Sequence, residues 1–193
     1  MSLAEPASRP SEARERLLDT ATKIFYATGI HSVGVDRIIA EANVTRSTFY
    51  RHFPAKEDLV VAYLDRIHQY HRAQVDQVLT SSKPSADVLR SIAHGIAREL
   101  QRPGFRGCAF INAAAEYPDP DHPVRTAVFA HREWFQTTIT GLFATSGNTS
   151  SEDAGRHYVM LRDGAKTAGC LGYPELTGET FLRGVEQLLD RES

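Results

Sequence analysis

The sequence contains few cysteines, no long apolar run and no excess of charge of one sign. Its two cysteines, Cys108 and Cys170, exclude a disulfide framework and a four-cysteine zinc site. No apolar run approaches the ~18–20 residues that a membrane-spanning helix needs. Charged side chains interrupt the N-terminal stretch, where a secretory signal requires continuous apolar sequence. These absences predict a cytoplasmic protein without a membrane segment.

The net charge is close to zero, because 22 lysines and arginines stand against 24 aspartates and glutamates. This balance disfavours a protein that coats nucleic acid without regard to sequence. It does not exclude a local DNA-binding surface, which depends on where the charges lie. With 193 residues, 41% of them apolar and 24% charged, the chain has a globular composition and enough length to bury a core.

Helical periodicity is the main pattern that is present. Apolar residues recur every three or four positions over most of the chain, and glycine or proline separates the segments. The sequence therefore predicts an all-α protein of about nine helices, preceded by a disordered tail at residues 1–10. The expected helices span residues 11–28, 35–42, 45–52, 57–81, 85–101, 108–116, 123–144, 151–172 and 179–191.

Residues 34–53 contain the pattern of a helix-turn-helix motif. Two short helical segments are separated by Asn43, which tolerates the left-handed backbone of a tight turn. Thr45 is placed to cap the second segment. A recognition helix reads base edges from its first turn, so this segment is the expected reading helix.

The charge around this motif favours DNA binding. Between Asn43 and Lys56 there are three basic residues and no acidic one. An arginine pairs with guanine and a threonine methyl packs on thymine, whereas tyrosine, histidine and lysine suit phosphate oxygens. The predicted DNA-contacting residues are Thr45, Arg46, Ser47, Thr48, Tyr50, His52 and Lys56. The alternative is a helical hairpin without a DNA-binding role.

The order of residues around the motif resembles the tetracycline-repressor (TetR) family. The family pattern is A-x-x-x-F-x-x-x-G, D-x-I-x-x-x-A-x-V, T/S-x-x-x-x-Y-x-H-F and K-E-x-L. In this chain, within about residues 11–71, the matching residues are Ala21, Phe25, Gly29, Asp36, Ile38, Ala42, Val44, Thr45, Tyr50, His52, Phe53, Lys56, Glu57 and Leu59. Asn43 departs from the glycine that the family usually has there.

The resemblance implies a homodimer of two-domain chains. Residues 11–71 would form a three-helix DNA-binding domain, and residues 72–193 a larger helical domain for ligand binding and dimerisation. It implies a transcriptional repressor that a small-molecule inducer releases from a quasi-palindromic operator in double-stranded DNA. No metal, other cofactor or enzymatic activity is expected, and the resemblance names no effector.

The middle helices combine apolar and aromatic residues with a few polar groups, which is typical of a ligand pocket. The predicted pocket residues are Tyr63, Ile67, His94, Phe110, Ile111, Asn112, Phe129, Trp134 and Tyr158. For each of them, burial in the core is the alternative.

A dimer interface is expected on the last two helices. Gly164, Ala168 and Gly172 recur at every fourth position and form a smooth helix face that permits close approach. Phe181, Val185 and Leu188 form an apolar stripe on the final helix. Packing within one chain is the alternative.

Three further interpretations stay open. Cys108, near Arg106 at a predicted helix N-terminus, fits either a redox sensor or an inert buried thiol. His68 and His71, with Asp65, have a spacing that can share a metal, but no third ligand is fixed. Glu116 and Asp163 suit a cationic ligand or a structural role. A small helical enzyme and a dimeric binding module without regulatory activity are the remaining alternatives, although no common catalytic motif is present.

Overall fold

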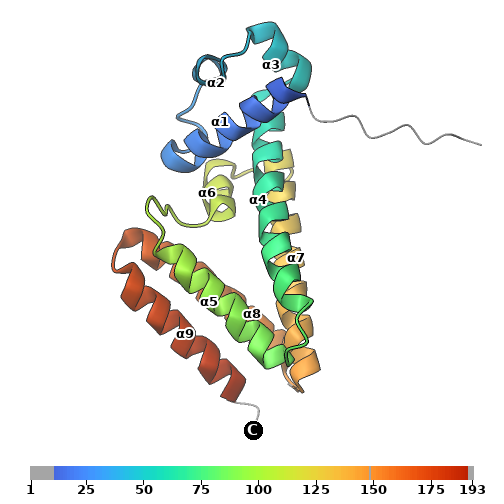
Figure 1. The fold of residues 1–193 in the computed structure, drawn as a ribbon, viewed down its shortest axis with the longest axis vertical. Helices are drawn as coiled ribbons and strands as arrows, with labels where there is room; N and C mark the ends of the chain where they lie inside the picture. Colours follow the sequence, from blue (N-terminus) through green and yellow to red (C-terminus); the bar gives the residue numbers. More distant parts are fainter. Residues whose placement is uncertain (1–10, 148, 191–193) are drawn as a thin grey trace, which may run out of the picture. The chain divides into compact units, whose positions relative to one another are not determined.

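The computed structural model of the protein describes residues 11–147 and 149–190. These residues form nine α-helices and no strand, which confirms the predicted all-α class (Figure 1). Within them, no helix is long and apolar enough to cross a membrane. The tail predicted at residues 1–10 lies outside the described part of the chain. The helices are α1 (Glu12–Thr28), α2 (Val35–Ala42), α3 (Arg46–His52), α4 (Lys56–Leu79), α5 (Ser85–Leu100), α6 (Ala109–Glu116), α7 (Pro123–Ser146), α8 (Ser151–Leu171) and α9 (Pro174–Asp190).

The chain divides into two compact units between Tyr63 and Leu64, inside α4. The division therefore precedes the boundary after residue 71 that the extent of the family pattern predicts. We call residues up to Tyr63 the N-terminal unit and residues from Leu64 the C-terminal unit.

The N-terminal unit packs α1, α2, α3 and the first turns of α4 around a small apolar core. Its fully buried side chains are Leu17, Ala21, Val33, Ile38, Phe49, Leu59 and Val60. Gly29 ends α1 with a φ of 90°, a conformation that favours glycine, and its N–H donates to the Phe25 carbonyl at 2.9 Å. The short helices thus depend on mutual packing, because isolated helices of seven or eight residues are not stable in water.

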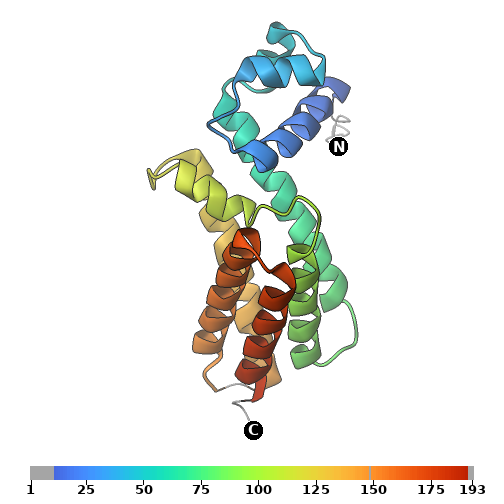
Figure 2. The same ribbon diagram turned by 90° about the vertical axis from the view of Figure 1, so that its left-hand side faces the viewer.

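The C-terminal unit is a bundle in which α5, α7, α8 and α9 pack against one another (Figure 2). Its core is rich in aromatic residues from three of these helices, and Tyr158 in α8 lies near Phe135, Phe143 and Phe181. The Tyr158 hydroxyl donates to the Leu89 carbonyl at 3.2 Å, which satisfies its only buried polar group. Burial raises the pKa of Tyr158, so this side chain stays neutral.

The structure corrects the start of the last helix. We expected it from residue 179, but α9 begins at Pro174, directly after Tyr173 with a positive φ of 52°. Proline suits a first helical turn because the N–H that it lacks would have no partner there. Gly178 lies inside the helix, and a Cβ placed on it would lie at an ordinary contact distance of 3.5 Å from the Ala97 Cβ of α5. Helix α9 therefore packs against α5 at this position.

Candidate DNA-reading surface and ligand cavity

The turn between α2 and α3 has the predicted left-handed conformation. Asn43 has φ 50° and ψ 55°, and its N–H donates to the Ala40 carbonyl at 3.2 Å. The next N–H, of Val44, donates to the Ile39 carbonyl at 3.2 Å. These bonds close α2 and redirect the chain into α3, so that two short helices form the helix-turn-helix motif.

The first turn of α3 is ordered by its cap and exposes polar side chains. Thr45 Oγ1 accepts a hydrogen bond from the Thr48 N–H at 3.2 Å and lies within 3.0 Å of the Ser47 and Thr48 hydroxyls. Phe49, which is fully buried, anchors the opposite side of the helix. The hydroxyl groups are therefore held together on a helix whose inner face is fixed by the core.

The predicted DNA-contacting side chains differ in their exposure to solvent and in the groups that they contact. Arg46 and Asp36 form an exposed ion pair, and Tyr50 is 43% exposed. His52 lies 3.2 Å from the Ser11 hydroxyl. Lys56 donates to the Ile30 carbonyl at 2.7 Å, so its ammonium group already serves the fold of the N-terminal unit. The candidate surface is therefore the exposed side of the segment from Thr45 to Tyr50, and Lys56 also has a structural contact within its own unit.

The C-terminal unit contains two partly open cavities that share a wall. The first, of about 130 Å³, lies among α4, α5, α7 and α8; the second, of about 180 Å³, lies among α6, α7 and α8. His131, Phe135 and Arg162 border both. We call the first the charged cavity and the second the apolar cavity.

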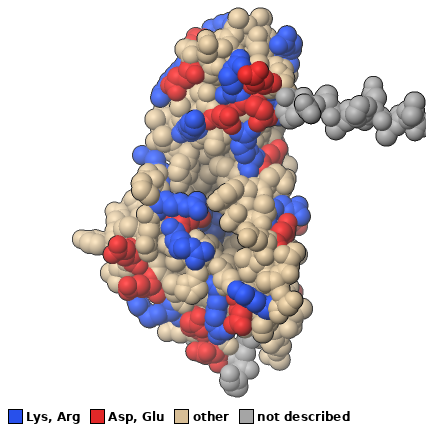
Figure 3. Space-filling model, viewed as in Figure 1, with Lys and Arg blue, Asp and Glu red and all other residues tan. Residues whose placement is uncertain are grey.

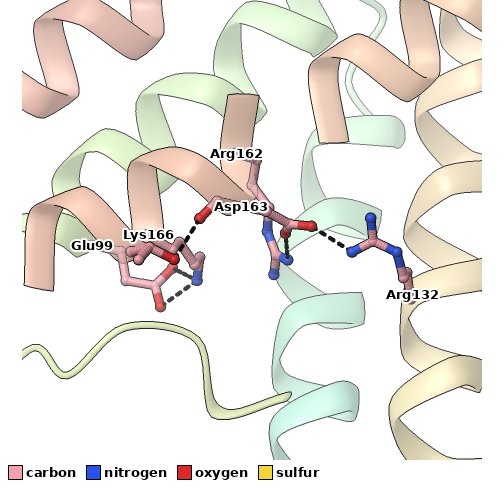
Figure 4. Close-up of polar contacts among 6 residues, drawn as sticks. Glu99, Arg132, Arg162, Asp163 and Lys166 are labelled. Atoms are coloured by element: carbon pink, nitrogen blue, oxygen red, sulfur yellow. Dashed lines mark hydrogen bonds and ion pairs between the residues drawn. The ribbon is translucent and has the colours of Figure 1, made fainter. Parts of the chain in front are cut away.

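The charged cavity is defined by two cationic side chains of α8. Arg162 is 6% exposed and Lys166 is 2% exposed, values that are unusual for charged residues. Lys166 Nζ lies 2.8 Å from both carboxylate oxygens of Glu99 in α5 (Figure 4). Arg162 donates to Asp163 at 2.7 Å, and Asp163 is shared with Arg132 of α7. This network joins three helices at the cavity.

Two histidines beside these cations remain uncharged. Burial, with Lys166 and Arg162 nearby, lowers the pKa of His71 to about 3. Burial, with Arg162 next to it, lowers the pKa of His131 to about 2. Burial raises the pKa of Glu99, but the neighbouring Lys166 outweighs this effect and the net shift is downward. At neutral pH the cavity therefore holds neutral imidazoles, two buried cations and an ionised Glu99.

Aromatic rings line the rest of the charged cavity. Trp134, Phe135 and Tyr70 contribute to its wall. His131 stacks on Phe110 with ring centroids 3.6 Å apart, and its Nδ1 lies 3.0 Å from His68 Nδ1. Its other nitrogen, Nε2, is buried and has no hydrogen-bond partner among the described residues. The cavity thus combines rings with a polar atom whose hydrogen-bonding capacity is unused.

The structure brings only part of the predicted pocket together. Trp134 lines the charged cavity, and Phe110, Ile111 and Phe129 line the apolar one. The other predicted residues do not line either cavity, because each has another role or place. Tyr63 belongs to the core of the N-terminal unit, Tyr158 to the core of the bundle, Asn112 donates to the Arg106 carbonyl, His94 is exposed, and Ile67 is half-buried on α4.

The sequence reasoning missed Arg162, Lys166, Glu99 and His131. A signal for two of them exists in α8, where the buried positions Ala154 and Tyr158 are followed at the same four-residue interval by Arg162 and Lys166. Two cations that continue an apolar helical face are candidates for a buried polar site. Glu99 and His131 have no comparable local signal, because their importance comes from contact with α8.

The predicted dimer face forms an open groove between α8 and α9. Its lining includes Gly164, Ala168, Gly172, Phe181 and Leu188, whereas Val185 is buried in the core. Apolar side chains stand exposed along it, notably Leu171 at 84%, Tyr173 at 83% and Met160 at 65%. A Cβ added to Gly164 would meet nothing within 4 Å, so this helix face is open to an approaching partner.

Comparison with known proteins identifies the fold and the motif. The profile of the bacterial regulatory proteins of the tetR family matches residues 17–63. A solved structure of SCO4454, a TetR-family transcriptional regulator from Streptomyces coelicolor, is 59% identical and superposes with a TM-score of 0.92 over 95% of this chain and 97% of that one. The chain belongs to the TetR family. It therefore carries the DNA-binding unit of a family of bacterial transcriptional regulators.

More distant TetR-family relatives have names that also describe regulators. The HTH-type transcriptional regulator LmrA of Bacillus subtilis is 25% identical over 64% of this chain and 67% of its own length. The HTH-type transcriptional repressor NemR of Escherichia coli K12 is 24% identical over 61% of this chain and 60% of its own length. The chain thus spans about two thirds or less of these curated relatives.

The three interpretations left open by the sequence now have definite surroundings. Cys108 is buried at the N-terminal end of α6 beside the apolar cavity, and Cys170 is exposed. His68 contacts His131, and the described residues contain no group of three or more His, Cys, Asp or Glu side chains arranged to hold a metal. Asp163 is engaged by Arg132 and Arg162, so in this TetR-family member it serves the network around the charged cavity.

Proposed function

We propose that this protein is a cytoplasmic, homodimeric transcriptional repressor that leaves a quasi-palindromic operator when a small molecule enters the C-terminal unit. The observation that carries the proposal is the capped first turn of α3, which presents polar side chains from a helix anchored by buried Phe49. A helix that is capped at its first turn and fixed on its inner face is suited to reading base edges in the major groove.

The distribution of charge supports a sequence-selective reader rather than a general DNA-binding protein. On the face shown in Figure 3, Lys and Arg atoms are interspersed with Asp and Glu atoms in each unit. Phosphate contacts alone therefore supply limited affinity, because non-specific binding depends on released counterions and hence on basic residues. The remaining affinity would come from base contacts and from the simultaneous binding of the two N-terminal units of a dimer.

Helix α4 is the candidate element that links effector and DNA. It contributes Leu59 and Val60 to the core of the N-terminal unit, and Tyr70, His71 and Val75 to the charged cavity. A bound effector shifts the population only if it binds the DNA-incompetent state more tightly than the competent one. We expect this difference in affinity to act through the position of α4.

The α8–α9 groove supports the homodimer. Exposed Leu171, Tyr173 and Met160 form more apolar surface than isolated side chains would, and such patches mark interaction sites. Helices α8 and α9 of two subunits would bury this surface in a four-helix interface. Light scattering at micromolar concentration should show a dimer; a monomer there contradicts the proposal.

DNA binding is tested by electrophoretic mobility shift on the DNA upstream of the protein's own gene. Arg46→Ala should weaken specific binding about ten- to hundredfold, because one bidentate base contact is worth about 1–3 kcal/mol. Tyr50→Phe should have a smaller effect, through one lost phosphate contact. Lys23→Ala, which removes an exposed positive charge from α1, is the matched control and should change binding less than about threefold. The proposal is contradicted if the wild-type protein binds this upstream DNA no more tightly than bulk DNA at moderate salt.

A footprint tests the symmetry of the complex. Two recognition helices in a dimer read half-sites about 34–36 Å apart, or a multiple of that distance. The protected sequence should therefore be quasi-palindromic. An asymmetric single half-site at saturating protein contradicts the dimeric reading mode.

A further inference from the structure

The charged cavity contains more positive than negative charge. Two buried cations of its lining, Arg162 and Lys166, stand against one lining carboxylate, Glu99, while Asp163, which Arg162 shares with Arg132, lies outside the lining. Arg98 and Arg102 also line the cavity but are exposed to solvent, and His71 and His131 add no charge because they are neutral. A ligand that balances this excess carries negative charge.

Arg162 has the geometry to bind an additional anion. A guanidinium group offers five N–H donors, and the Asp163 bond uses the Nη1 atom only. The side chain borders the cavity while its guanidinium carbon lies 5.2 Å from the Phe135 ring centroid. The guanidinium group thus packs near an aromatic ring, and its remaining N–H groups are the donors that a carboxylate in the cavity would use.

The size and lining of the cavity select the rest of the ligand. A closed cavity of about 150 Å³ accommodates one benzene ring, and the charged cavity, of about 130 Å³, is partly open to solvent, so a single ring is close to the largest group that it can hold. Trp134 and Phe135 line it together with His131, whose buried Nε2 has no hydrogen-bond partner among the described residues. One aromatic ring thus fits between side chains that favour ring stacking.

We propose that the effector is a small aromatic carboxylate, with its ring among Trp134, Phe135 and His131 and its carboxylate at Arg162 beside Lys166. This inference rests on the proposed function, because it names the chemical class of the inducer. A neutral aromatic compound would leave the positive charge unbalanced, and an aromatic amine would add to it. The charge of the ligand, rather than its ring alone, therefore determines binding.

The experiment uses three ring compounds of nearly equal size with the full-length dimer. Trp134 is the only tryptophan of the chain and lines the cavity, so its fluorescence, excited at a wavelength where the ligands do not absorb, reports occupancy. Benzoate should cause a saturable change, and neutral benzamide and cationic benzylamine should bind at least about tenfold more weakly. Acetate, which lacks the ring, should also bind at least about tenfold more weakly. Equal binding of benzoate and benzamide, or no saturable binding of benzoate, would overturn the inference.

Two variants of α8 test the position of the carboxylate. Arg162→Met should weaken benzoate binding about ten- to hundredfold without a matching effect on benzamide, since it removes a charge-assisted hydrogen bond. Arg156→Met removes a positive charge from the exposed face of the same helix and should leave benzoate binding unchanged. Equal losses in the two variants would overturn the assignment. If the Arg162→Met variant does not fold, the comparison of benzoate with benzamide on the wild-type protein still tests whether the ligand must carry negative charge.

The measurement separates this inference from the proposed function. Benzoate binding seen by Trp134 but without release of operator DNA supports the ligand class and contradicts induction. Release of the operator by neutral aromatic compounds that bind as tightly as benzoate supports induction and overturns the ligand class.

Discussion

The two units of the protein place their charges in opposite ways. In the N-terminal unit the candidate functional groups, such as Arg46 and Tyr50, stand exposed over a core in which none of the described residues buries a charged side chain. In the C-terminal unit Arg162, Lys166 and His131 are buried inside the bundle. The difference corresponds to the size of the proposed partner, because DNA would be approached from outside and a small ligand would be surrounded.

This contrast has an energetic consequence. Exposed ion pairs contribute little to stability, so the surface of the N-terminal unit can change with small effects on folding. A buried ion loses its hydration, and removal of its partner leaves it uncompensated. Substitutions at the charged cavity should therefore cost more stability than equivalent substitutions on the surface.

The largest effect is expected from Glu99→Gln. This change removes the negative charge from Lys166, which is 2% exposed, and should lower the free energy of unfolding by about 3 kcal/mol. Urea unfolding followed by Trp134 fluorescence measures it. Glu179→Gln, which breaks an exposed pair with Arg183 on α9, is the control and should cost less than about 0.5 kcal/mol. Similar losses in both variants would abolish the proposed contrast between interior and surface charge.

The next effect concerns packing within the C-terminal unit. A Cβ on Gly155 of α8 would overlap the Thr140 hydroxyl and lie 3.1 Å from the Thr140 Cα, which is backbone and cannot turn away. Gly155→Ala should therefore lower the unfolding free energy by about 2 kcal/mol. Gly141→Ala in α7, where nothing lies within 4 Å, should raise it by up to about 1 kcal/mol. Thermal unfolding of the two variants should thus shift in opposite directions.

The buried histidines predict loss of stability in mild acid. The pKa of His131 is about 2 and that of His71 about 3 in the folded protein, against 6.5 for each when unfolded. Below pH 6.5 the unfolded state binds more protons, so stability is complete above pH 6.5 and falls as the pH drops towards the folded values. Each histidine should contribute about 1.4 kcal/mol per pH unit.

His131→Gln checks this assignment, because it removes one of the two titrating groups. Between pH 6 and pH 4.5 its unfolding free energy should depend less steeply on pH than that of the wild type, by about one proton. His94→Gln, at an exposed position of α5, should retain the wild-type slope. An unchanged slope in His131→Gln would show that this histidine is already protonated in the folded protein.

The smallest effect is expected at the turn of the DNA-reading motif. Asn43 has a φ of 50°, and alanine at a left-handed position costs about 1 kcal/mol. Asn43→Ala should accelerate hydrogen exchange of the α2 and α3 amides by about fivefold. Asn43→Gly should not accelerate it, because glycine adopts this conformation without strain. Equal exchange in the alanine variant and the wild type would remove the turn as a determinant of the motif.

The N-terminal unit was predicted more completely than the ligand cavity. Its signals are local: Asn43 at the turn, Thr45 at the cap and the ordered spacing from Ala21 to Leu59 all act within a few residues. Lys56 has one contact that no local signal indicates, the bond from its ammonium group to the Ile30 carbonyl, which connects residues far apart in sequence.

The cavity was only partly predicted because its residues meet through helix packing. The apolar and aromatic pattern of the middle helices predicted pocket residues, four of which the structure places at the two cavities: Trp134, Phe110, Ile111 and Phe129. The same pattern also predicted two tyrosines that lie in filled cores, Tyr63 in the N-terminal unit and Tyr158 in the bundle. Periodicity identifies the buried face of a helix, but it does not distinguish a filled interior from a cavity.

The sequence by itself determined the helices, the helix-turn-helix turn and its cap, because hydrogen bonds and backbone preferences over a few residues control them. Only the tertiary structure decided that Lys166 meets Glu99, that Arg162 shares Asp163 with Arg132, and that His131 is kept neutral. Those properties arise from desolvation and from charges brought together by packing between α5, α7 and α8, which act through space rather than along the chain.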